Sequence, residues 1–83
     1  MLATVASVSS ADRIKRHIGA HFSIPSKIIQ TPAALSKDGC GYSIRFDDAH
    51  KSVVVRAATA LKINIRAFYR EENTPSGTRY IED

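Results

Sequence analysis

The chain has one cysteine, no tryptophan, three tyrosines and three phenylalanines among its 83 residues. With Cys40 alone, no internal disulfide can form, so we expect a reducing, cytoplasmic setting. His17, His21 and His50 lie far from Cys40 in the sequence and form no ligand pattern with it. We therefore expect neither a metal nor a cofactor.

Long apolar runs are also missing. No stretch approaches the roughly 20 residues that a bilayer-spanning helix needs. The segment 1–8 lacks the basic region of a signal peptide. A membrane is therefore not an expected partner, and a chain of this length makes one domain with a small core.

Charge is distributed unevenly along the chain. Residues 1–70 carry 11 Lys or Arg and 4 Asp or Glu, whereas residues 71–83 carry one Arg and four acids. The second segment also contains the turn-forming cluster 73–77. We predict a basic domain over 1–70 followed by a flexible acidic tail over 71–83. A basic body attracts an anionic partner, although a plain solvated surface explains the same charge.

Hydrophobic periodicity predicts six main elements. Ser9 and Ser10 offer an N-cap for the first helix, and Asp47 or Asp48 for the second. We expect strands at 2–8, 27–30, 42–46 and 63–69, and helices at 11–22 and 49–61. This order predicts an α+β, ferredoxin-like βαββαβ sandwich, in which two helices cover one face of a four-stranded antiparallel sheet. Free edge strands make a homodimer through the sheet edges a further possibility.

The other face of the predicted sheet offers an alternative function. On this register it carries Ser43, Arg45, Asn64, Arg66 and Phe68, which suits a non-enzymatic module that binds RNA or a small anion. The segment 41–46 partly matches the third strand of the RNA recognition motif. However, Ile44 stands where that motif has a stacking aromatic, and the first strand has no aromatic at all. Nucleic acid is therefore not the ligand that we expect.

Cys40 is the first candidate for chemistry. Gly39 and Gly41 flank it, which indicates an open backbone that other molecules can reach. Only the thiolate is reactive, and Lys37 and Arg45 favour it if they fold near the sulfur, whereas Asp38 opposes it. The alternative is a thiol with a purely structural role.

Partners for catalysis are not evident around Cys40. No Ser, Cys or His triad is present, and a helix start explains Asp47 and Asp48. We therefore do not expect an enzyme. Thr31 and Pro32 suit the cap and first position of a short helix whose N-terminus would hold an anion, but a plain turn of helix over 31–35 explains them as well.

The segment 28–46 resembles the selenium/sulfur carrier-like family. That family has a Thr-Pro-x-x-Leu segment, a Ser/Gly-rich link, then Cys-Gly and an apolar strand ending in Arg-Phe. The matching residues here are Thr31, Pro32, Leu35, Ser36, Cys40, Gly41, Arg45 and Phe46. The resemblance extends over about 2–69, while the link is more charged than is usual in the family.

The resemblance implies a role for each part of this segment. Cys40 would be the carrier thiol, taking sulfane sulfur or selenium as a persulfide from a donor such as a cysteine desulfurase. An unknown acceptor protein would then receive it. Taking the resemblance together with the residues around the thiol, we expect five binding residues: Gly39, Gly41, Lys37, Arg45 and Thr31.

Overall fold

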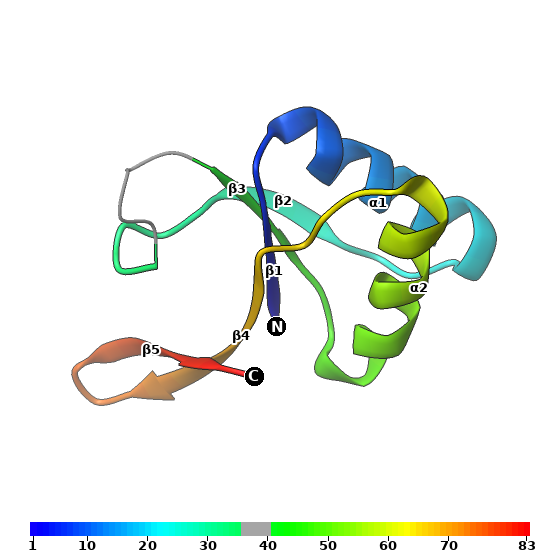
Figure 1. Ribbon diagram of the computed structural model, residues 1–83. Helices are drawn as coiled ribbons and strands as arrows, with labels where there is room; N and C mark the ends of the chain where they lie inside the picture. Colours follow the sequence, from blue (N-terminus) through cyan, green and yellow to red (C-terminus); the bar gives the residue numbers. More distant parts are fainter. Residues whose placement is uncertain (36–40) are drawn as a thin grey trace.

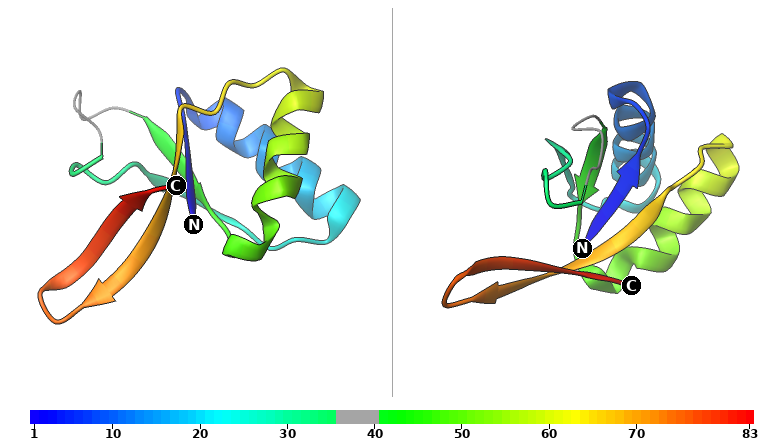
Figure 2. Two further views of the ribbon diagram at one scale, coloured as in Figure 1. Left: turned by 60° about the horizontal axis from the view of Figure 1, so that its bottom comes forward. Right: turned by 60° about the vertical axis from the view of Figure 1, so that its left-hand side comes forward.

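The computed structural model describes residues 1–35 and 41–83 (Figure 1). The elements follow the order β1 (Leu2–Val5), α1 (Val8–Phe22), β2 (Lys27–Gln30), β3 (Tyr42–Arg45), a 3-10 turn η1 (Asp48–His50), α2 (Lys51–Leu61), β4 (Ala67–Thr74) and β5 (Gly77–Glu82). Both helices lie on one side of an antiparallel sheet (Figure 2). The predicted α+β class, with two helices and an antiparallel sheet, is confirmed.

The sheet has five strands, in the order β2-β3-β1-β4-β5. The prediction of four strands is therefore wrong. The extra strand arises because Pro75 and Ser76 form a tight turn and Gly77 adopts φ +124, a conformation that favours glycine. The chain then pairs back along β4 from Gly77 to Glu82. Strands β2 and β5 form the two edges, and dimerisation through them stays a prediction.

The segment expected to be a tail contains the end of β4 and all of β5. These strands form a hairpin that extends away from the helices (Figures 1 and 2). Asp83, which follows β5, is bonded through both backbone and side chain: its N–H donates to the Phe68 carbonyl, and its carboxylate pairs with Lys51. The domain boundary at residue 70 and the mobility of residues 71–83 stay predictions.

The core lies between the helices and the sheet. Helix α1 contributes Ala11, Ile14 and Ile18, and α2 contributes Val54, Ala57 and Ala58. From the sheet side come Ala3, Val5, Ile44 and Phe46. The first helix begins earlier than predicted, because the Ser7 hydroxyl caps it by accepting from the Ser10 N–H. Asp47 caps η1, as its carboxylate accepts from the Ala49 N–H.

The side chains of the last predicted strand were assigned to the wrong faces of the sheet. Strand β4 begins at Ala67, and Phe68 pairs with Ala3 of the helix-covered face. Phe68 therefore packs on the core, edge-on to Phe46. A shift of one residue along a strand moves every side chain to the opposite face. The connection 62–66 still buries part of Ile63 and Ile65, which produced the misleading alternation in the sequence.

Candidate functional site

The candidate site is the connection between β2 and β3, which contains Cys40. The structure describes the two ends of this connection, up to Leu35 and from Gly41 onward. Lys37, Gly39 and Cys40 lie outside the described residues, so the roles predicted for them stay predictions. Of the remaining predicted site residues, Thr31 and Gly41 lie together, and Arg45 lies elsewhere. The contacts described below are therefore those at the base of the connection, around Thr31 and Gly41.

Thr31 and Gly41 close the base of this connection. The Thr31 N–H donates to the Gly41 carbonyl at 3.1 Å, which extends the β2–β3 ladder by one step. The Thr31 hydroxyl also lies 2.8 Å from the Ser43 hydroxyl. Because Ser43 is completely buried, this hydrogen bond satisfies a hydroxyl that water cannot reach. Both ends of the connection are thus fixed to the sheet.

Gly41 has a conformation that other residues adopt only with strain. Its φ is +120, and a Cβ placed on it would lie 3.4 Å from the Val5 carbonyl oxygen and 3.6 Å from the Thr31 hydroxyl. The lack of a side chain therefore lets the chain turn into β3 directly after Cys40.

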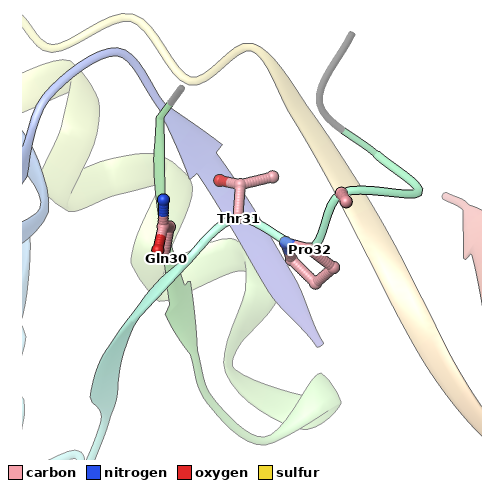
Figure 3. A pocket seen from close by; sticks show the side chains of 4 residues that line it. Gln30, Thr31 and Pro32 are labelled. Atoms are coloured by element: carbon pink, nitrogen blue, oxygen red, sulfur yellow. The ribbon is translucent and has the colours of Figure 1, made fainter. Parts of the chain in front are cut away.

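A turn follows Thr31, where the sequence predicts one turn of helix. The Leu35 N–H donates to the Pro32 carbonyl at 2.9 Å, and residues 33–35 form a turn. A pocket of ≈ 340 Å³ opens here, lined among the described residues by Gln30, Thr31, Pro32 and Ala33 (Figure 3). With no helix, the anion site that its N-terminus would make is lost.

Arg45 lies at the opposite end of β3 from Gly41. It pairs there with Glu71 of β4: Nε donates to Oε1 at 3.0 Å, and the terminal nitrogen to Oε2 at 2.9 Å. This hydrogen bond raises the pKa of Arg45 above its ordinary value. The structure therefore does not bring Arg45 to Thr31 and Gly41, and its cation is already engaged.

The predicted binding face of the sheet is also altered. Phe68 lies on the helix-covered side, and Arg66 precedes β4 in a connection. On the face away from the helices, Leu2 is 0% exposed and Thr4 is 7% exposed. Arg45 does lie on this face, since it pairs with Leu2, but its guanidinium is bonded to Glu71 and Phe68 does not join it there.

Residues 1–35 and 41–83 contain neither a cluster of metal ligands nor a membrane-spanning helix. The rings of His17 and His21 lie 4.4 Å apart on α1. Nowhere in these ranges do three or more His, Cys, Asp or Glu side chains come together as metal ligands would. Neither described helix has the length and apolarity that a membrane crossing requires.

Sequence reasoning missed one residue of the site, Ser43. The strict alternation of 42–46 placed it on a solvated face, whereas it is buried against Thr31. A small hydroxyl residue two positions after Gly41, in a strand whose other polar residue is the long Arg45, was the available signal.

Comparison with known proteins gives one match. No curated protein and no solved structure matches the chain significantly. The model of one protein family, described as "Putative Se/S carrier protein-like", matches residues 1–70. That range includes β1 to the first half of β4 and the whole connection between Thr31 and Gly41. The chain therefore belongs to the Se/S carrier protein-like family.

Proposed function

We propose that the protein carries sulfane sulfur or selenium as a persulfide, or its selenium counterpart, on Cys40. The observation that carries this proposal is the family match, which spans the only cysteine of the chain. The fixed base at Thr31, Gly41 and Ser43 supports it, because Cys40 immediately precedes an anchored residue. A carrier needs a reachable thiolate and no further catalytic group.

The proposed loading step is a transfer between two thiols. The Cys40 thiolate attacks the outer sulfur of a donor persulfide, and the new S–S bond forms as the donor S–S bond breaks. The donor cysteine leaves as a thiolate with the electron pair of the broken bond. The outer sulfur keeps its proton or charge, so no external oxidant or reductant is needed. A cysteine desulfurase has the persulfide that this step requires.

The wider setting is part of the same proposal. The protein would act in the cytoplasm as a non-enzymatic carrier between a desulfurase and an acceptor protein. Its first four strands and two helices would form a ferredoxin-like core to which β5 is added. The strand order β2-β3-β1-β4 and the antiparallel pairing support that assignment.

Intact mass spectrometry tests the proposal. The protein is incubated with a cysteine desulfurase and cysteine, or separately with inorganic polysulfide, and its mass is recorded under non-reducing conditions. We expect a gain of one or more sulfur atoms, reversed by a thiol reductant. Fragment masses should place the added sulfur on Cys40.

The matched control is Cys40→Ser. Because the chain has no other cysteine, this variant should gain no sulfur from either donor. Wild-type protein that stays unmodified with both donors would contradict the carrier function. Sulfur retained by the Cys40→Ser variant would contradict the assignment to this residue.

A further inference from the structure

Exposed cations lie along the connection 62–66, which reaches the sheet beside the base of the candidate site. The Arg66 N–H donates to the Thr4 carbonyl at 2.8 Å, while Gly41 lies against the carbonyl of the next residue, Val5. Arg66 and Gly41 thus flank the end of β1 on its two sides. Figures 1 and 2 show the connection 62–66 crossing this same end of the sheet.

Two further cations lie beside this connection. Lys62 ends α2 in a left-handed conformation, with its N–H bonded to the carbonyls of Ala58 and Thr59. The Arg13 guanidinium of α1 donates to the Leu61 carbonyl at 3.5 Å, which places it at the same helix end. Arg13, Lys62 and Arg66 are all exposed, and none forms an ion pair with another described residue. We call these three residues the cationic rim.

Among the Asp and Glu residues that the structure describes, only Asp12 lies near the cationic rim. Asp12 is on α1 near the rim, but its carboxylate is 2.8 Å from Arg16 and so is already paired. Asp47 and Asp48 precede α2 at the opposite end of the sheet. The other acids, Glu71, Glu72, Glu82 and Asp83, are in or next to the β4–β5 hairpin. Among the described residues, no unpaired acid therefore lies beside the connection 62–66 with these three cations.

We propose that the cationic rim is the docking surface for the sulfur donor, and that it fits an acidic surface beside the donor's persulfide. This inference rests on the proposed function. Arg66 lies beside the end of β1 across from Gly41, and Arg13 and Lys62 continue the positive charge along the connection 62–66 to the end of α2. A partner held along this connection would have its persulfide next to the base to which Cys40 is attached. Complementary charge chiefly raises the rate of encounter between two proteins.

The rate of sulfur transfer tests the inference. Loading is followed by intact mass, first with a cysteine desulfurase and cysteine, then with inorganic polysulfide, which needs no docking surface. The double variant Lys62→Glu/Arg66→Glu is compared with Lys27→Glu/Arg56→Glu. Each pair reverses two exposed cations and takes the formal net charge from +4 to zero, but only the first pair alters the rim.

We expect the rim variant to load from the desulfurase about tenfold more slowly, with polysulfide loading unchanged. The control variant should load at close to the wild-type rate from both donors. Raising the salt from about 50 to about 300 mM should slow the wild type toward the rim variant, because screening shortens the range of the attraction. Arg66→Gln should give a smaller loss than the double variant.

Several results would overturn the inference. Equal desulfurase rates for the wild type and the rim variant, or equal losses in both double variants, would show that the rim does not guide docking. Loading of the wild type by polysulfide but not by the desulfurase would also overturn it while the carrier function stands. Absence of loading from either donor would instead remove the proposed function. If polysulfide loading, which involves an anion, falls in parallel in the rim variant, Arg66→Gln decides, because it introduces no negative charge.

Discussion

The guanidinium of Arg45 forms a two-point hydrogen bond with the carboxylate of Glu71. Arg45 belongs to the conspicuous Arg-Phe end of β3, within the range that matches the family, whereas Glu71 is the first residue beyond that range. The β4–β5 hairpin is therefore joined by side chains, as well as by the β4 backbone, to a residue of the family core.

The Arg45–Glu71 pair should contribute measurably to stability at low salt. Because the Arg45 side chain is 44% exposed and that of Glu71 20%, we expect Glu71→Gln to lower the free energy of unfolding by about 0.5 kcal/mol. Urea denaturation of both single variants and of Glu71→Gln/Arg45→Gln gives the coupling energy. The more exposed Asp12–Arg16 pair is the comparison, and Asp12→Asn should cost less. Coupling that persists unchanged at about 1 M salt would contradict an ionic origin.

Gly41→Ala should destabilise the protein. At φ +120 alanine is strained even though its Cβ would make only ordinary contact with the Val5 carbonyl, so we expect a loss of about 1–2 kcal/mol. Thermal or urea denaturation measures it. Gly19→Ala is the matched control: Gly19 is within α1 and a Cβ there meets nothing within 4 Å, so it should stabilise by about 0.5–1 kcal/mol. Equal effects of the two changes would show that the backbone at Gly41 is not special.

The Thr31–Ser43 hydrogen bond should appear as a coupling in a double-mutant cycle. Ser43→Ala leaves the Thr31 hydroxyl without this partner, and Thr31→Val does the reverse, so each should cost about 1 kcal/mol. The combination Thr31→Val/Ser43→Ala should cost less than the two together, because no hydroxyl is left unpaired. Free energies of unfolding from urea titrations provide the cycle. Strict additivity would mean that the two hydroxyls are not bonded to each other.

Asp83 should titrate below its ordinary pKa of 3.8. Its carboxylate accepts a hydrogen bond from Lys51, and Arg70 adds a second positive charge at 3.6 Å. Since the pKa is lower in the folded state, the stabilisation by Lys51 is present above the unfolded value and is lost as the pH falls through the folded one. Carboxyl chemical shifts followed by NMR measure the midpoint. Lys51→Gln should move it upward, and an unchanged midpoint would contradict the pairing.

Local pattern was sufficient for much of the fold. Strand β2 lies at the predicted residues 27–30, and two amphipathic helices follow β1 and β3 as predicted. Residues 63–69 failed, because Ile63 and Ile65 are half-buried from a connection rather than from a strand. Alternation of apolar and polar residues alone does not distinguish a strand from a half-buried connection. The error reversed the face of the sheet assigned to Phe68.

The hairpin and the base of the site were beyond the reach of sequence patterns. Strand β5 is mostly polar, so the turn-forming residues 73–77 suggested an ending rather than a return. Its stability comes from pairing with β4 and from Asp83, neither of which leaves a hydrophobic signature. Ser43 was assigned to solvent because its burial depends on Thr31, a contact that requires the folded sheet.

The hydrogen bond between Thr31 and Gly41 holds the two ends of the connection together, so the residues between them form a closed loop. For such a loop, doubling the number of residues adds only about 0.6 kcal/mol of closure entropy. The free energy of unfolding of the domain therefore depends little on the length of the stretch that contains Cys40. It does depend on the residues at the two ends of that stretch. Selection is therefore free to tune the reach and surroundings of the thiol by insertion or deletion, without rebuilding the framework to which it is attached.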